Sequence, residues 1–235
     1  MKILPTHFKE EFQSRTALVL GEHCLGKIQQ TKLAIIGVGG VGSAAAISLL
    51  RIGFSNMLLA DGDVIEITNF NRHFQGYPEY LGWNKTEAMV DQLKKINPWG
   101  KYVGLFKYID ENNFDDIKQY HPDFIIDAID HLDEKIILIQ NCLRYNIKVI
   151  SSMGAGGKKY PELVKKGTIF SSTDCSLARK MRKKLKQLNI TEDLPVVYST
   201  EPSNFTRQQP GSLFTVTASF GLAIASWIVE QLDQK

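Results

Sequence analysis

The chain has 235 residues, of which 43% are hydrophobic and 23% are charged, enough for one domain with a full core. Its formal charge of +3 is compatible with an anionic partner but does not require one. The three cysteines lie far apart with no CxxC pair. This spacing excludes a disulfide framework and a four-cysteine zinc site, and it favours a reducing, cytoplasmic location.

Apolar runs and helical periodicities alternate along the first two thirds of the chain. The first residues lack the apolar core of a signal peptide, and a helical arm is predicted over 7–30. Strands are predicted over 32–36, 57–60, 102–106, 124–126 and 148–151, and helices over 43–51, 85–96, 113–119 and 133–145. This alternation predicts an α/β fold of the Rossmann type, a mostly parallel sheet covered by helices on both faces.

The last third of the chain departs from this rhythm. Residues 152–212 contain a glycine-rich segment, a basic helix and a loop with proline and serine. Residues 213–229 are apolar but include threonine, serine and glycine, which indicates a packed helix rather than a membrane span, so no membrane partner is expected. We therefore expect a single domain over 1–235, with a core at 7–151 and an extension at 152–235.

Glycines follow the first predicted strand directly, in the sequence GVGGVG. Gly37, Gly39, Gly40 and Gly42 permit a tight turn and let backbone N–H groups approach a phosphate at the N-terminus of the next helix. Asp61 ends the second predicted strand, where an acidic side chain can bind ribose hydroxyls. The core is therefore expected to bind a nucleotide, and the loop alone would suggest NAD.

Charged residues beyond the glycine loop favour a triphosphate over a dinucleotide. Arg72 and Lys85 can neutralise phosphates and the charge that develops as pyrophosphate leaves. Asp130 closes the fourth predicted strand, at the edge of a parallel sheet where ligands bind, and is placed to hold Mg²⁺. A dinucleotide enzyme has no need of this pair of cations, so an NAD oxidoreductase is the disfavoured interpretation.

The order of these motifs resembles the adenylation domain shared by ThiF, MoeB and the ubiquitin-activating enzymes. The matching segments are GVGGVG, DGD at 61–63, NFNR at 69–72, GWNK at 82–85 and DAID at 127–130. The resemblance implies that ATP is the nucleotide and that Mg²⁺ lies at Asp130. It also implies five ATP-binding side chains: Asp61 at the ribose, Asp63 beside it, and Asn69, Arg72 and Lys85 at the phosphates. Arg72, Lys85 and Asp130 are the implied catalytic residues.

The extension resembles one branch of this family, the tRNA threonylcarbamoyladenosine dehydratases. ThiF-like and MoeB-like members usually carry two CxxC pairs, whereas this chain has SMGAGG at 152–157, DCSLARKMRKKL at 174–185 and VVYSTEP at 196–202. The branch implies ATP-dependent cyclisation of threonylcarbamoyladenosine in tRNA through an acyl-adenylate, carried out by a homodimer. Cys175 stands where the branch is expected to have proline, and the implied chemistry requires no cysteine. A sulfur-transfer or electron-transfer protein partner is left open.

The predicted basic helix gathers much of the positive charge of the chain. Leu177, Met181, Leu185 and Leu188 form an apolar stripe at helical spacing that would pack against the core. The cations on the remaining face suit contact with the phosphates of tRNA, although such a run is often only a solvated surface. The predicted tRNA-binding residues are Arg179, Lys180, Arg182, Lys183, Lys184 and Lys186.

Alternative functions and side chains remain at this stage. An adenylyltransferase for a ubiquitin-like sulfur-carrier protein would share the ATP site, and a non-catalytic module could retain the fold. The missing CxxC pairs argue against the carrier-protein enzyme, and the intact charged set argues against the module. Cys24 and Cys142 are interpreted as packed residues, and a redox or acyl-accepting role for Cys175 stays open. His73 and His131 each adjoin a predicted site residue, and whether they line the cleft stays open.

Overall fold

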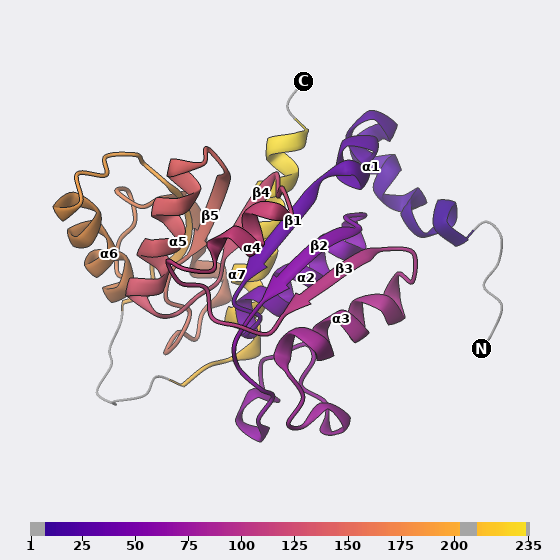
Figure 1. The fold of residues 1–235 in the computed structure, drawn as a ribbon, viewed down its shortest axis with the longest axis horizontal. Helices are drawn as coiled ribbons and strands as arrows, with labels where there is room; N and C mark the ends of the chain where they lie inside the picture. The colour runs from indigo at the N-terminus through magenta and orange to yellow at the C-terminus, as the bar shows by residue number, and fades with distance from the viewer. Residues whose placement is uncertain (1–7, 203–210, 234–235) are drawn as a thin grey trace.

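The computed structural model describes residues 8–202 and 211–233, so residue 7, where the predicted arm begins, lies outside the described residues. The strands are β1 (Lys32–Ile36), β2 (Asn56–Ala60), β3 (Lys101–Leu105), β4 (Phe124–Asp127), β5 (Lys148–Ser152), β6 (Val164–Thr168) and β7 (Pro195–Ser199). They form a seven-stranded sheet in the order β3-β2-β1-β4-β5-β7-β6 (Figure 1). Neighbouring strands are parallel except β6, which pairs antiparallel with β7. The predicted mostly parallel sheet is confirmed.

Helices cover both faces of this sheet (Figure 1). They are α1 (Phe8–Gln30), α2 (Gly40–Ile52), α3 (Lys85–Ile96), α4 (Phe114–Gln119), α5 (Leu132–Arg144), α6 (Ser176–Gln187) and α7 (Phe214–Leu232). Successive side chains of a strand point to opposite faces, so Leu33 and Ile35 pack with α1, α2, α3 and α7. Ala34 and Ile36 pack with α4, α5 and α6. The predicted two-sided arrangement is therefore correct.

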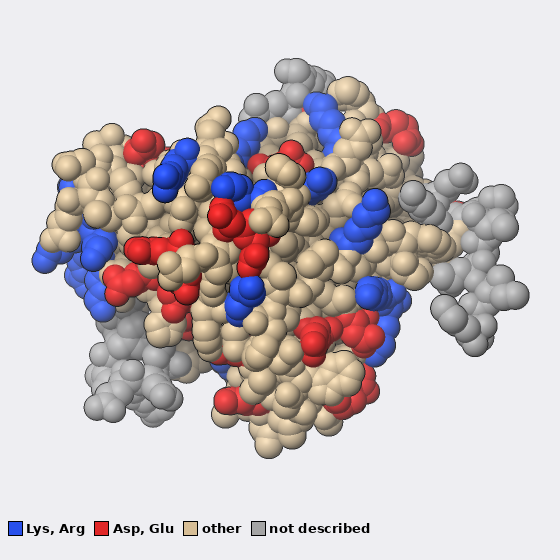
Figure 2. Space-filling view, in the orientation of Figure 1, with Lys and Arg blue, Asp and Glu red and all other residues tan. Residues whose placement is uncertain are grey.

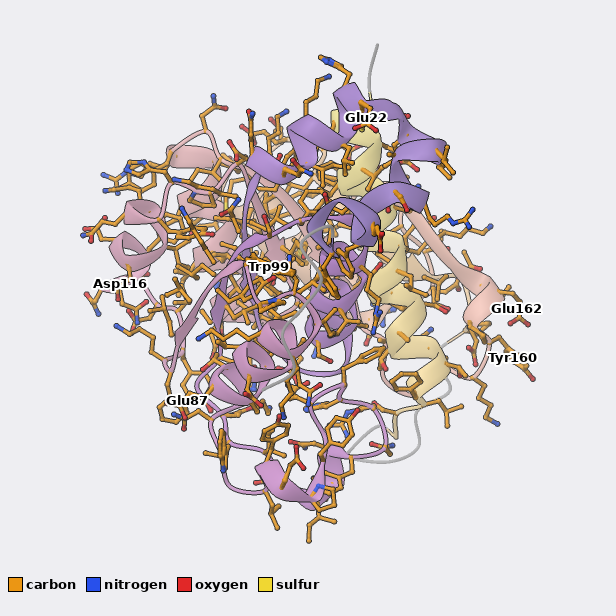
Figure 3. All side chains as sticks on the ribbon, turned by 90° about the vertical axis from the view of Figure 1, so that its right-hand side faces the viewer. Glu22, Glu87, Trp99, Asp116, Tyr160 and Glu162 are labelled. Carbon is orange, nitrogen blue, oxygen red and sulfur yellow. The ribbon has the colours of Figure 1, made fainter. Side chains whose placement is uncertain are left out.

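The C-terminal helix α7 lies beside α2 on one face of the sheet (Figures 1 and 3). By length and composition alone it could cross a membrane, but Val216, Phe220, Ile224 and Ile228 are buried in the core. Gly221 permits this close packing, since a Cβ atom there would lie 2.6 Å from both the Ala44 Cβ and the Ala45 nitrogen. The expectation of a packed helix is confirmed.

The extension adds strands that the sequence pattern did not reveal fully. β7 joins the parallel sheet through β5, and β6 forms the outer edge with Lys165 and Lys166 exposed. An exposed edge strand needs no continuous apolar run, so β6 lacks the usual signal. At the other end of the chain, the ring of Phe8 contacts that of Trp99, with 5.0 Å between centroids. Trp99 is labelled in Figure 3.

Candidate active site

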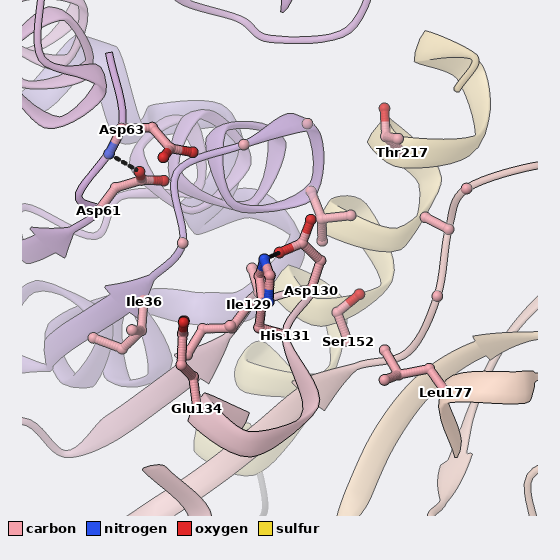
Figure 4. A pocket seen from close by; sticks show the side chains of 18 of the residues that line it. Ile36, Asp61, Asp63, Ile129, Asp130, His131, Glu134, Ser152, Leu177 and Thr217 are labelled. Carbon is pink, nitrogen blue, oxygen red and sulfur yellow. Dashed lines mark hydrogen bonds and ion pairs between the residues drawn. The ribbon is translucent and has the colours of Figure 1, made fainter. Parts of the chain in front are cut away.

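A cavity of about 920 Å³ lies at the carboxyl ends of the parallel strands. Ile36, Ala60, Ala128 and Ser152, at or just after the ends of β1, β2, β4 and β5, contribute to its lining. The chain order reverses between the neighbouring strands β1 and β4, which is where open α/β sheets bind ligands. Figure 4 shows Asp61 and Asp63 on one side of this cavity and Ser152 and Leu177 on the other.

The glycine loop forms one wall of the cavity. Gly37 has a φ of 87°, and a Cβ atom there would lie 2.7 Å from the Ala128 oxygen, so only glycine fits this turn. Gly39 and Gly40 line the cavity at the N-terminus of α2, which is suited to bind an anion. Gly42 does not contribute to the lining. It lets α2 approach the preceding turn, because a Cβ atom would lie 1.9 Å from the Gly37 oxygen.

Two aspartates directly after β2 and the first lysine of α3 form one hydrogen-bonded group. The Asp61 carboxylate accepts hydrogen bonds from the backbone nitrogens of Val38 (2.7 Å) and Asp63 (2.8 Å), and burial raises its pKa although Lys85 opposes this. Lys85 Nζ lies 2.5 Å from Asp63 Oδ2, and the Tyr108 hydroxyl donates to Asp63 Oδ1. Burial acts to raise the pKa of Asp63, but these two hydrogen bonds outweigh it and the pKa is lowered. This group presents both charge signs to the cavity.

The turn after Ile67–Asn69 carries the second predicted cation. Arg72 lines the cavity, and its guanidinium donates to the Thr68 oxygen at 2.7 Å and to Asn71 Oδ1 at 3.0 Å. His73 also lines the cavity, which settles the question left open for it by the sequence. Asn69 instead lies behind the lining, where its side chain accepts from the Glu66 nitrogen and caps this short helix. Its predicted phosphate contact stays a prediction.

The turn after β4 and the first turn of α5 bring further acidic groups to the cavity. The Asp130 side chain is 96% exposed and lies 3.8 Å from His131 Nε2 (Figure 4). Glu134 faces the same space, and its pKa is raised by burial and by the neighbouring carboxylates, although His131 opposes this. Across residues 8–202 and 211–233, no three metal-ligating side chains group closely enough to hold a metal ion by themselves.

A buried ion pair holds this turn from behind, and sequence reasoning missed it. Lys135 Nζ lies 2.9 Å from Asp127 Oδ1 and donates to the Ile129 oxygen at 2.7 Å, and both side chains are fully buried. Ser151 Oγ donates to the other Asp127 oxygen at 2.5 Å. A lysine in an amphipathic helix normally indicates a solvated face, so only the three-dimensional structure shows that the pair fixes the approach to Asp130.

The basic helix α6 contributes both to the cavity and to the surface. Ser176, Leu177 and Lys180 line the cavity opposite the glycine loop. Lys and Arg side chains gather over α6 at the left edge of the molecule (Figure 2). Four of the six predicted tRNA-binding residues are exposed on α6: Arg179, Lys180, Lys183 and Lys186. A fifth, Lys184, is half-exposed, and its Nζ lies 3.8 Å from Asp133 Oδ1.

Two expectations for this helix need correction. Arg182 turns inward and donates to the oxygens of Ile169 (3.1 Å) and Ser172 (2.9 Å), so it anchors the preceding loop instead of presenting its charge to a partner. Leu188 is not part of the packed stripe, because α6 ends at Gln187 and Leu188 is 38% exposed. Leu177, Met181 and Leu185 do pack against the core.

The three cysteines carry free, buried thiols. Cys24 and Cys142 are 4% and 0% exposed within the core, which confirms their interpretation as packed residues. Cys175 caps α6 by accepting from the Ala178 nitrogen at 3.5 Å. A redox or acyl-accepting role for it remains without a structural observation in its favour.

Comparisons with known proteins agree with this geometry. The ThiF family model matches residues 13–235. The tRNA threonylcarbamoyladenosine dehydratase of Bacillus subtilis is 34% identical, with 80% of this chain and 74% of the relative covered. The Haemophilus influenzae dehydratase is 30% identical over 90% of this chain and 89% of its own. The structure of the Escherichia coli dehydratase TcdA in complex with ATP superposes with a TM-score of 0.91 at 27% identity, covering 98% of this chain and 97% of that one.

Proposed function

The chain belongs to the ThiF family, and from this premise we propose that it is an enzyme that uses ATP to cyclise threonylcarbamoyladenosine in tRNA. The dehydratases that it resembles, one of them solved with ATP, support this assignment over activation of a carrier protein. One observation carries it on the structural side. The glycine loop, together with Arg72 and Lys85, lines one end of a single cavity, and residues of the basic helix α6 line the other end.

The first step forms an acyl-adenylate. An oxygen of the threonine carboxylate attacks the α-phosphorus of ATP, and the bond between the α- and β-phosphates breaks to release pyrophosphate. Arg72 and Lys85 face the cavity and stabilise the negative charge that develops. Asp61 is already oriented by two backbone N–H groups, and its carboxylate can accept from ribose hydroxyls as well.

Asp130 fits the role of a Mg²⁺ ligand. Its carboxylate is exposed at the cavity, and Mg²⁺ is usually held by one or two carboxylates together with substrate phosphates, so a cage of protein ligands is not required. When bound, the ion would neutralise charge on the departing pyrophosphate.

The second step closes the ring. The carbamoyl group next to the activated threonine carbonyl attacks that carbon and gives up an N–H proton to solvent, a five-membered ring forms, and AMP leaves with the former carboxylate oxygen. Because the attack is intramolecular, the enzyme contributes orientation and needs no nucleophile of its own. The burial of Cys175 as a helix cap is compatible with this route.

The test is ring closure by purified protein with ATP, Mg²⁺ and tRNA carrying threonylcarbamoyladenosine, followed by mass spectrometry of the nucleosides. Wild type should yield the cyclic nucleoside and AMP. Lys85→Ala should lower the rate about 10²–10³-fold, the usual cost of removing a preorganised charge-stabilising group. Lys94→Ala, at an exposed position of the same helix α3, is the matched control and should be unaffected. No cyclic product from wild type would refute the assignment.

We also propose that α6 binds the phosphates of the tRNA. Arg179, Lys183 and Lys186 are its exposed cations outside the cavity lining, and each lost phosphate contact should reduce the slope of affinity against salt by about 0.7–0.9. Their combined change to glutamate should weaken tRNA binding and leave ATP binding intact. The same change at the exposed Arg51, Lys94 and Lys101 is the charge-matched control. Equal affinities and salt slopes for the two triple variants would remove α6 from the interface.

The cellular setting is part of the proposal. We place the enzyme in the cytoplasm as a homodimer in which residues 1–235 act as one domain. The free thiols favour a reducing compartment, and Leu18 and Val19, 78% and 81% exposed on α1, offer apolar surface for self-association. Light scattering during gel filtration measures the oligomeric state directly.

A further inference from the structure

His73 lies behind the glycine loop in a position that the neighbouring chain fixes. Its ring is 6% exposed, and Nε2 lies 3.7 Å from where a Cβ atom on Gly39 would be. Two residues on, Gln75 Nε2 donates to the Val38 oxygen at 2.7 Å. Between them, the Phe74 nitrogen donates to Ser43 Oγ at 3.2 Å. The imidazole is therefore held against the part of the loop where α2 begins.

The two ring nitrogens of His73 differ in their surroundings. Nδ1 is buried and has no hydrogen-bond partner within residues 8–202 and 211–233, whereas Nε2 is at the end of the ring that faces Gly39 and the cavity. A buried N–H group without an acceptor costs more than a buried lone pair without a donor. The favoured tautomer thus carries its proton on Nε2, which directs an N–H group toward the cavity.

The imidazole is also uncharged. The pKa of His73 is lowered to about 3, first by burial and then by the nearby Lys85 and Arg72, against the opposing effect of Asp63. A third cation beside these two would be repelled, but a neutral N–H group is not. It can therefore add a directed hydrogen bond to an anion that the two cations already attract.

We propose that His73 is a further ATP-binding residue, whose Nε2–H donates a hydrogen bond to an oxygen of the triphosphate above Gly39. This inference rests on the proposed use of ATP. A hydrogen bond to a charged acceptor in a site of this kind contributes enough that its loss should weaken ATP binding roughly 10- to 100-fold. Adenosine, which has no phosphates, should not depend on His73.

Three proteins and two ligands test the proposal by isothermal titration calorimetry: wild type, His73→Phe and His73→Gln, each with ATP plus Mg²⁺ and with adenosine. His73→Phe keeps a planar ring but has no donor, so it should bind ATP weakly and adenosine normally. His73→Gln can place an amide N–H near the position of Nε2 and should recover most of the ATP affinity. Urea unfolding of the ligand-free proteins checks that each variant is folded.

The outcomes separate this inference from the proposed function. Wild-type protein that fails to bind ATP would refute the proposed function. If wild type binds ATP and His73→Phe binds it equally well, the hydrogen bond to the triphosphate is refuted. An equal loss of ATP and adenosine affinity in His73→Phe would show that His73 only supports the fold, and a His73→Gln variant no better than His73→Phe would refute the donor role.

Discussion

Removing the buried ammonium of Lys135 should destabilise the fold far more than removing an exposed one. Without it, the Asp127 carboxylate would keep, among the described residues, the Ser151 hydroxyl and the Ile129 N–H group as its donors, in a site with no solvent exposure. Breaking a fully buried ion pair from one side costs about 3–5 kcal/mol. That is a large part of the 5–15 kcal/mol typical of a whole domain.

Urea denaturation of Lys135→Met measures this loss as a lower unfolding midpoint at an unchanged slope. Lys118→Met is the matched control, because Lys118 lies 2.6 Å from Asp115 on α4 but both side chains are exposed, and exposed pairs contribute little to stability. The double variant Asp127→Asn/Lys135→Met leaves no buried charge unpaired and should be more stable than Lys135→Met. A Lys135→Met midpoint equal to that of Lys118→Met would refute this reasoning.

Three further predictions concern pH, the anchor in α6 and the thiols. The pKa of His73 is about 3 in the folded chain, whereas the ordinary value is 6.5. Between these two pH values the imidazole is protonated in the unfolded chain but not in the folded one. The free energy of unfolding therefore falls as the pH drops from 6.5 toward 3. From pH 7.5 to 5.5 wild type should therefore lose about 1.4 kcal/mol more than His73→Gln in urea denaturation, and equal losses would count against the buried neutral imidazole. Arg182→Ala should lower the melting temperature by several degrees because it frees the Ile169 and Ser172 carbonyls, whereas Lys183→Ala should not change it. A folded variant with all three cysteines changed to serine should still close the ring, as measured by mass spectrometry of the nucleosides. A folded but inactive Cys175→Ser protein would show that the mechanism includes a covalent or redox step at this cysteine.

The sequence predicted those features that depend on local order along the chain. The strand–glycine–helix junction at Gly37–Gly42 and the acidic residue after β2 are set by neighbours in sequence, so their position in the fold follows from the element order. The mostly parallel sheet follows from the same alternation. What each residue touches across the fold could not be predicted in this way.

Arg182 and Lys135 show why the remainder required the structure. Both carry a charge at a helical position, and a charge in that pattern normally indicates solvent. Arg182 finds its acceptors 10 and 13 residues upstream, and Lys135 finds Asp127 at the end of a strand buried beneath it. A buried charge is tolerated only when it is paired and hydrogen-bonded. Here the partners come from other elements, so they leave no local signal in the sequence.

The packing of α7 against α2 has a consequence for folding while the chain is being synthesised. Thr217 of α7 lies beside Gly40, where a Cβ atom would come within 3.1 Å of it, and Gly221 lies against Ala44 and Ala45. Because α2 lies near the start of the sequence and α7 near residue 214, the glycine loop leaves the ribosome long before the helix that packs against it. The roughly 170 residues between them take about 8–34 s to synthesise at about 5–20 residues per second. During that interval the apolar face of α2 is uncovered, so the nascent chain should be most dependent on chaperones before α7 emerges.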